Sequence, residues 1–275
     1  LFQKRKDIGN AVQKPLHLTI HTSNSFPHSA GIASSASSMG ALALCLCSLE
    51  DQLFGTLKED AAFRQKASYV ARLGSGSASR SIYAYMGAWG STSDIEGSSD
   101  LYAVGFESPL HEVFKTFHDD ILIISKGEKS VSSTAGHALM DDNIYADNRY
   151  MQAKRNLQNL LPALRKGDLE MFGKITEQEA LTLHALMMSS NPPYILMQPN
   201  SLAAIQKVQR FRADTGHPLY FSLDAGPNLH LLYPDEIKTT VQAFIQSELV
   251  QLCEGGQIIQ DQVGLGPLEI APEVE

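Results

Sequence analysis

Apolar residues along this chain recur either at helical spacing or in the alternation of a half-buried strand. In residues 34–53 the larger apolar side chains follow a helical period, and small residues occupy part of the surface, which favours close packing against a sheet. The same criterion predicts helices at 34–53, 59–73, 145–164, 169–187, 201–214 and 236–249, and a short helix entered from the turn at 75–80. Gly74 is expected to cap the helix 59–73.

Strands are predicted where β-favouring residues alternate or cluster between turn-forming residues. These segments are 16–21, 101–106, 121–125, 219–224, 229–233 and 257–263. Residues 225–228 favour a turn, so the chain from 219 to 233 is expected to form a hairpin. The order of elements predicts an α+β fold in two lobes, 1–118 and 119–275, with mixed sheets and helices on one face.

The bulk composition limits the possible classes of function. The chain has 275 residues, 43% hydrophobic and 19% charged, as in a globular protein that buries a sizeable core. Its 22 basic and 30 acidic residues give a formal net charge of −8, which argues against binding to nucleic acid or to an anionic membrane. No apolar run approaches the roughly 20 residues of a transmembrane helix, and the first residues are not a secretory signal. We therefore expect a soluble, cytoplasmic protein.

Neither the cysteines nor the histidines predict a metal site. Cys45, Cys47 and Cys253 lack the paired spacing of zinc or redox motifs, and the two-residue offset directs Cys45 and Cys47 to different faces of their helix. Buried packing is their expected role. His17 and His21 lie on the polar face of the predicted strand 16–21. We expect no protein-bound transition metal.

The sharpest local signal is the stretch 27–37, Pro-His-Ser-Ala-Gly-Ile-Ala-Ser-Ser-Ala-Ser, at the start of a predicted helix. Helix N-terminal amides and the positive end of the helix dipole favour an anion there. Small residues let the backbone approach phosphate oxygens and serine hydroxyls add donors, so the candidates are Ala30, Gly31, Ala33, Ser34, Ser35 and Ser37. The Gly-Lys-Ser/Thr ending of a Walker A loop is absent. By residue type alone, a plain loop with a helix cap is an equally good interpretation.

In the form Pro-x-x-x-Gly-x-x-Ser-Ser-Ala, this stretch resembles the second motif of the galactokinase, homoserine kinase, mevalonate kinase and phosphomevalonate kinase (GHMP) superfamily. Other segments narrow the resemblance to the diphosphomevalonate decarboxylase family: 24–27, 75–81, 131–134 with Gly136, His184 with Pro192 and Pro193, and above all Asp224-Ala-Gly-Pro-Asn228. The resemblance spans nearly the whole chain. It implies a two-lobed GHMP-kinase-like fold, with an N-terminal lobe like domain 2 of ribosomal protein S5 and a ferredoxin-like C-terminal lobe. It also implies ATP and Mg²⁺ as cofactors and a homodimer.

The resemblance also assigns roles to residues. Asp224 would be catalytic and accept or orient the proton of the substrate's tertiary hydroxyl. Arg80 would be catalytic too, because a guanidinium can grip a carboxylate or phosphate with two donors. Substrate contacts would come from Ser75, Gly76, Ser77, Ala78, Ser79, Arg80, Ser132, Ser133 and Thr134. By residue type alone, a turn is favoured for Asp224 and a surface charge for Arg80, while a polar turn and a diphosphate site are equally good interpretations of 132–134.

The implied reaction is the ATP-dependent decarboxylation of mevalonate 5-diphosphate in isoprenoid biosynthesis. Phosphorylation makes the tertiary oxygen a leaving group, and its departure lets the neighbouring carboxylate leave as carbon dioxide, which gives isopentenyl diphosphate. Positioning and electrostatics would supply the catalysis. Two alternatives stay open: a small-molecule kinase that phosphorylates mevalonate or phosphomevalonate without decarboxylation, and a non-catalytic homologue.

Two stretches depart from the family pattern. The upstream Lys-Tyr-Trp-Gly-Lys type motif, which supplies substrate and nucleotide contacts, has no match in this sequence. Because the chain begins at Leu1, we expect residues of the native protein to precede it. Residues 82–89 differ from the family's Gly-Gly-Phe stretch, which affects the expected shape of the substrate pocket.

Overall fold

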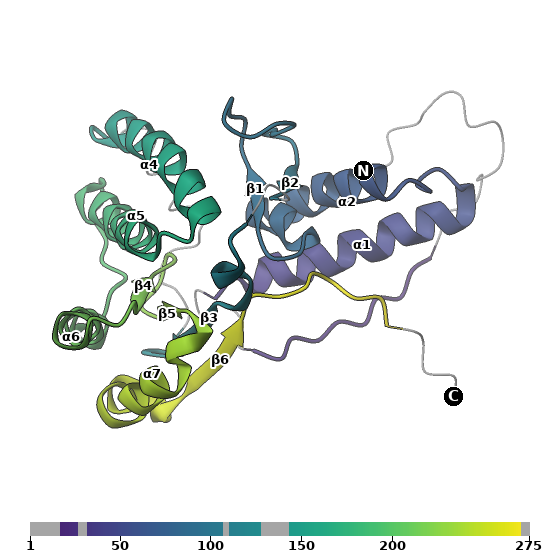
Figure 1. The fold of residues 1–275 in the computed structure, drawn as a ribbon. Helices are drawn as coiled ribbons and strands as arrows, with labels where there is room; N and C mark the ends of the chain where they lie inside the picture. The colour runs from purple at the N-terminus through teal and green to yellow at the C-terminus, as the bar shows by residue number, and fades with distance from the viewer. Residues whose placement is uncertain (1–16, 27–31, 107–109, 128–142, 271–275) are drawn as a thin grey trace.

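The computed structural model describes residues 17–26, 32–106, 110–127 and 143–270, arranged as two groups of elements (Figure 1). The helices are α1 (Ser34–Phe54), α2 (Asp60–Gly74), α4 (Ala146–Lys166), α5 (Leu169–Ser189), α6 (Pro199–Thr215) and α7 (Lys238–Phe244). The strands are β1 (Gly87–Trp89), β2 (Ala103–Gly105), β3 (His118–Leu122), β4 (Tyr220–Ser222), β5 (Leu229–Tyr233) and β6 (Ile258–Gln262). Short 3-10 segments are η1 (Gly76–Ile82), η2 (Glu112–Thr116), η3 (Asp235–Ile237), η5 (Val250–Leu252) and η6 (Glu254–Gly256), and a π turn, η4 (Ile245–Leu249), extends α7. Within the described ranges, none of the helices is both long and apolar enough to cross a bilayer.

In the first group, α1 and α2 pack together around η1. Their shared core is built mainly from alanines that are almost inaccessible to solvent, with Ile82 of η1 as its largest fully buried member. The antiparallel pair β1–β2 lies beside η1, with Trp89 opposite Ala103. Small side chains let the backbones approach closely, so η1 is held on several sides by neighbouring elements.

The prediction that Gly74 caps α2 is wrong. Gly74 is the last residue of the helix, and Ser75, with a φ of −155°, is the capping residue. A Cβ on Gly74 would lie 2.4 Å from the sulfur of Met39 on α1. The glycine is therefore explained by the close approach of α1 to α2 and not by a left-handed turn.

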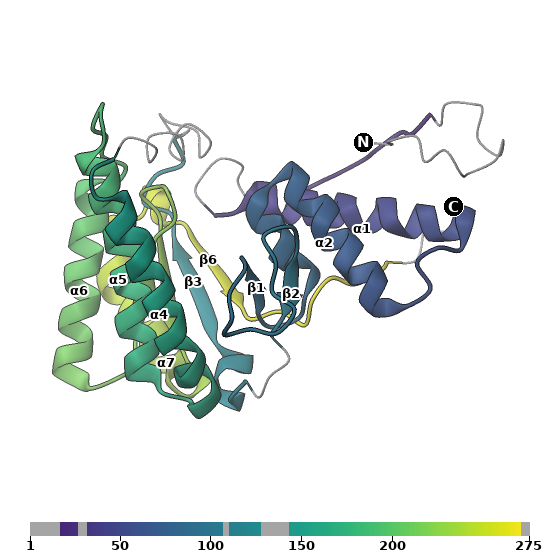
Figure 2. The ribbon, with the colours of Figure 1, turned by 90° about the horizontal axis from the view of Figure 1, so that it is seen from above.

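The second group is an antiparallel sheet in the order β4–β5–β3–β6, covered on one face by helices. Apolar residues from α5, α6, α7 and strands β3, β4 and β5 form its core, in which Phe221, Leu231 and Tyr233 are fully buried. Figure 2 shows α4–α7 on one side of β3 and β6, and α1 and α2 on the other side. The order of strands and helices is that of a split βαβ arrangement, which confirms the α+β prediction.

The opposite face of this sheet meets the first group. Ile121 and Ile123, together with the half-buried Ile259, pack against Ile32, the residue two positions before α1. The C-terminal segment also joins the groups, because the amide of Tyr85 donates to the carbonyl of Gly264 (2.9 Å). The start of α1 is thus fixed to the sheet of the second group.

Several predicted elements agree with the structure, while others differ for physical reasons. The helix and hairpin predictions are confirmed within a few residues, and β3 starts at the predicted lobe boundary, whose position stays a prediction. The strand at 16–21 is wrong: residues 17–21 have no strand partner among the described residues, and Leu18 and Ile20 are 53% and 56% exposed. Residue 16 lies outside the described part. Cys47 is buried, as expected, whereas Cys45 is exposed.

Candidate functional site

The start of α1 is presented by a left-handed residue, Ala33, which is not a typical helix-capping residue. Its φ is 59° and its carbonyl accepts the amide of Ser37 at 3.2 Å. Ser35 and Ser37 are exposed and Ser34 is half-buried. These three predicted ATP-binding serines therefore reach the surface at the first turn of a 21-residue helix, where the helix dipole favours an anion.

The predicted substrate turn touches this helix start. The hydroxyl of Ser75 lies 3.2 Å from that of Ser35, so the two serines are within hydrogen-bond distance across 40 residues of chain. The structure thus brings the candidate ATP segment and the candidate substrate segment together. The sequence alone did not predict this contact, because it depends on the packing of α2 against α1.

Within the turn, Ala78 and Ser79 are fully buried. The hydroxyl of Ser79 donates to the carbonyl of Gly76 at 2.9 Å, and a Cβ on Gly76 would lie 2.8 Å from the Trp89 ring. These residues shape the turn, and in this conformation Ala78 and Ser79 have no surface to offer a ligand. The other predicted residues of this turn keep accessible surface for a substrate contact: Ser75, Gly76, Ser77 and Arg80.

Arg80 belongs to the first group and Asp224 to the second, yet their charges interact. Removal of water by the surrounding protein lowers the pKa of the Arg80 guanidinium, and the Asp224 carboxylate partly offsets this. An arginine remains protonated at neutral pH in either case. Although the Arg80 side chain is partly desolvated, both residues keep exposed surface, and in the described part of the chain no direct ion pair joins them. A cation and an anion held in this way can bind a polar ligand between them.

The turn that carries Asp224 is held by three nearly inaccessible side chains. His184 of α5 contacts the Asp224 carbonyl through Nε2 (3.1 Å), and the hydroxyl of Ser201 on α6 donates to the Pro227 carbonyl (2.6 Å). The side chain of Asn228 accepts a hydrogen bond from the amide of Ser125, three residues after the end of β3 (3.0 Å). Because these hydrogen bonds come from different elements of the second group, the position of the Asp224 turn depends on how those elements pack together.

The protonation state of His184 follows from its surroundings. Burial lowers the pKa of the imidazole, and its hydrogen bond to the Asp224 carbonyl and the Asp224 charge oppose this shift. A carbonyl can only accept, so the Nε2 nitrogen carries the proton and donates. The ring is therefore a neutral donor to the main chain of the candidate catalytic residue.

Sequence reasoning gave no role to these anchors. Ser201 appeared only as the first residue of a predicted helix, and His184 only as part of the family resemblance. The signal in the sequence was a polar residue among apolar neighbours at a helical position that the pattern buries. Buried polar side chains in native proteins make hydrogen bonds, so such a residue is expected to have a partner. The candidates Ala30, Gly31, Ser132, Ser133 and Thr134 lie outside the described residues.

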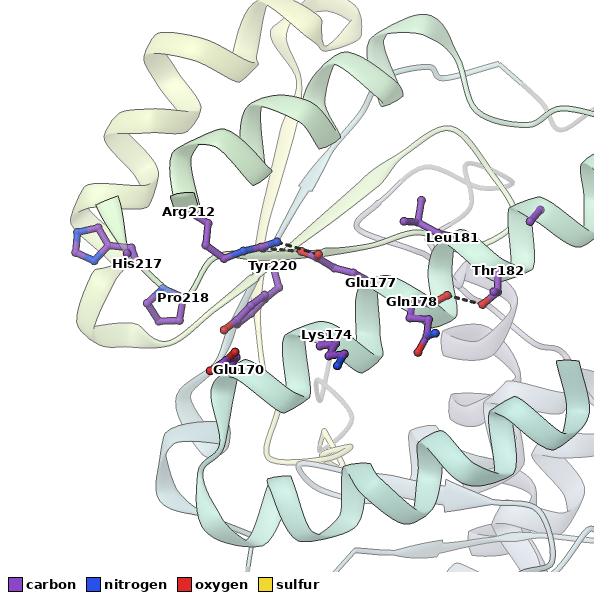
Figure 3. A pocket seen from close by; sticks show the side chains of 12 residues that line it. Glu170, Lys174, Glu177, Gln178, Leu181, Thr182, Arg212, His217, Pro218 and Tyr220 are labelled. Carbon is purple, nitrogen blue, oxygen red and sulfur yellow. Dashed lines mark hydrogen bonds and ion pairs between the residues drawn. The ribbon is translucent and has the colours of Figure 1, made fainter. Parts of the chain in front are cut away.

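A surface groove of about 960 Å³ lies elsewhere, between α5, α6 and β4 (Figure 3). Arg212 spans it, paired with Glu177 (2.7 and 3.0 Å), and stacks over the ring of Tyr220 at 5.0 Å. It contains none of the predicted site residues. Because the charges of Arg212 and Glu177 already pair with each other, they are less available to a ligand than those of Arg80 and Asp224. The groove is therefore a weaker candidate for the active site.

Two protein-family models match this chain. Residues 2–103 match the diphosphomevalonate decarboxylase-like N-terminal domain, and residues 120–266 match the mevalonate 5-diphosphate decarboxylase C-terminal domain. The diphosphomevalonate decarboxylase of Schizosaccharomyces pombe is 30% identical over 224 residues, which are 80% of this chain and 54% of that protein. The chain spans about half the length of the curated relatives it matches.

Solved structures share the fold. The mevalonate diphosphate decarboxylase from Legionella pneumophila has a TM-score of 0.71 and 28% identity, with 86% of this chain and 69% of that chain covered. The structure of MDDEF in complex with MVAPP, AMPPCP and magnesium has a TM-score of 0.72 and 28% identity, covering 88% and 68%. These similarities confirm the predicted fold class.

Proposed function

Because the chain belongs to the diphosphomevalonate decarboxylase family, we propose that the protein uses ATP to convert mevalonate 5-diphosphate to isopentenyl diphosphate and carbon dioxide. The names of the curated relatives support this activity. The structure of MDDEF with MVAPP, AMPPCP and magnesium supports ATP and Mg²⁺ as its requirements.

The observation that carries the proposal is the contact between Ser35 at the start of α1 and Ser75 in the turn that leads to Arg80, whose hydroxyls lie 3.2 Å apart. Ile32, just before α1, packs against Ile121 of the second group, and the Asp224 carboxylate of that group acts on the pKa of Arg80. An anion-favouring helix start, a guanidinium and a carboxylate therefore lie in one neighbourhood. A substrate with a diphosphate, a carboxylate and a tertiary alcohol, together with a nucleotide, has the groups that suit these three features.

The roles follow from the chemistry of each group. Ser34, Ser35 and Ser37 would donate to phosphate oxygens of ATP at the start of α1. Arg80 would grip an anionic group of the substrate and so orient it. Asp224 would accept or orient the proton of the tertiary hydroxyl as its oxygen takes the terminal phosphoryl group. The phosphorylated oxygen then leaves as inorganic phosphate with the electrons of its C–O bond. The carboxylate leaves as carbon dioxide, and the electrons of the broken C–C bond form the alkene.

The described residues suit magnesium that arrives with ATP better than a metal held by protein alone. No group of three or more His, Cys, Asp or Glu side chains in the described ranges could hold a metal ion. Mg²⁺ bound to nucleotide phosphates keeps several of its waters and takes only one or two protein carboxylates, so it does not require such a group. When bound, magnesium would offset the negative charge of the phosphates.

A product assay tests the proposal. The full-length protein is incubated with ATP and with mevalonate, its monophosphate or its diphosphate, and ADP and carbon dioxide are measured separately. We expect both products from the diphosphate ester only. ADP without carbon dioxide would favour the kinase alternative, and neither product would favour a non-catalytic homologue.

The oligomeric state and location are part of the same proposal. The family resemblance supports a homodimer, and unpaired cysteines support the reducing cytosol. Light scattering coupled to size-exclusion chromatography tests the first, and fractionation of cells tests the second. A monomer across the working concentration range would contradict the dimer.

A further inference from the structure

The geometry points to His184 as a positioning residue for Asp224: from the buried face of α5 it fixes the main chain that aims the carboxylate. This inference rests on the proposed function. It concerns a residue that does not touch the substrate and acts only through the residue it holds.

The direction of the Asp224 carboxylate depends on the local backbone. Its Oδ1 accepts the amide of the next residue, Ala225, at 2.7 Å, which ties the side chain to its own turn. The side chain is exposed, so packing does not hold it from outside. If the main chain at Asp224 rotates, the carboxylate rotates with it.

Among the described residues, the Asp224 carbonyl accepts one hydrogen bond from within its turn and one from a distant element. The amide of Gly226 donates at 2.7 Å from within the turn, whereas His184 Nε2 donates at 3.1 Å from 40 residues away. His184 is 1% exposed, so no solvent competes for this bond. His184 thus links the Asp224 carbonyl itself to α5, whereas Ser201 and Asn228 hold the later part of the turn.

The helix that carries His184 is itself fixed against the sheet. A Cβ on Gly173 of α5 would lie 2.0 Å from two ring carbons of Tyr220 on β4, so helix and strand are in close contact. β4 leads directly into the Asp224 turn. The donor His184 and the Asp224 turn are therefore carried by two elements that pack directly against each other, α5 and β4, which fixes the position of one relative to the other.

The test compares substitutions at His184 in the full-length protein, with turnover of mevalonate 5-diphosphate measured well below the unfolding temperature. We expect His184→Leu, which has no donor, to lower kcat about tenfold or more with little change in KM for ATP. His184→Gln should restore most of kcat, because its amide nitrogen reaches roughly the place of Nε2. His184→Asn should not, because its amide is one bond shorter. The Gln and Asn variants keep the test decisive if the Leu variant does not fold.

A second histidine provides the matched control. His118 is 4% exposed in the same lobe and bonds to Asp235 (2.7 Å), away from the Asp224 turn. His118→Leu should lower stability while leaving kcat near wild type. In the Asp224→Asn background, His184→Leu should cause no further loss, because its effect passes through that carboxylate.

The outcomes separate two kinds of failure. If the wild-type protein releases no carbon dioxide, the proposed function fails, and with it the premise of this inference. If the wild type is active but His184→Leu matches His118→Leu in kcat, His184 is merely structural. Equal activity of the Gln and Asn variants, or losses that multiply with Asp224→Asn, would also overturn the positioning role.

Discussion

Ser68→Ala should destabilise the N-terminal lobe and weaken substrate binding together, because one buried hydroxyl joins three elements. Ser68 on α2 is fully buried. Its hydroxyl donates to the carbonyl of Ser79 on η1 at 2.8 Å and accepts the amide of Ala103 on β2, also at 2.8 Å. Ser79 precedes Arg80, so the same hydroxyl supports the candidate substrate turn.

The size of the effect follows from the two bonds. Without the hydroxyl, the fully buried amide of Ala103 loses the acceptor that the structure gives it, which costs about 1–3 kcal/mol. Loss of the donor to the Ser79 carbonyl adds about 1 kcal/mol. The total of about 3 kcal/mol corresponds to a decrease of about 6–12 °C in thermal midpoint.

Thermal unfolding followed by circular dichroism measures the first effect, and steady-state kinetics at low temperature measure the second, as a higher KM for mevalonate 5-diphosphate. Ser190→Ala is the matched control. Ser190 is 5% exposed, and its single hydroxyl hydrogen is shared between the carbonyls of Met187 (2.9 Å) and Pro192 (2.8 Å). It should cost only about 1 kcal/mol and leave KM unchanged. A midpoint for Ser68→Ala no lower than that of Ser190→Ala would refute the reasoning.

Three further changes test other parts of the structure. Asp224→Asn should lower kcat by orders of magnitude with ATP binding nearly intact, whereas Asp261→Asn, at an exposed aspartate that also accepts the next amide (2.8 Å), should have no effect. Gly173→Ala should lower the thermal midpoint although alanine favours helices by about 1 kcal/mol, because its Cβ would overlap the ring of Tyr220; a stability equal to wild type would contradict the described contact. Burial raises the pKa of Asp120, so between 3.8 and its higher folded value the native state holds a proton that the unfolded chain releases. The free energy of unfolding of the wild type, compared with that of Asp120→Asn, should therefore increase as pH falls from 7 toward 4. Denaturant unfolding of both proteins at each pH measures this difference, and a difference that does not change with pH would contradict the prediction.

The local elements were decided by the sequence itself. Helix α1 begins at the predicted Ser34, and the hairpin of β4 and β5 lies where turn formers separate two apolar runs. Helical hydrogen bonds span four residues and a hairpin joins neighbouring strands, so both are encoded in short windows. Asp224 and Arg80 became candidates through motifs that are also local.

The tertiary structure decided everything that depends on distant partners. Residues 17–21 alternate like a strand but have no strand partner among the described residues, and β3 begins at the polar-looking His118 because that residue and Asp120 are buried. Gly74 looked like a cap and is instead a contact with Met39. The anchoring of Asp224 by His184 joins residues 40 positions apart. Burial and long-range hydrogen bonds depend on which distant elements pack together. A short stretch of sequence does not determine this, so it cannot predict which polar groups become buried and which partners they find.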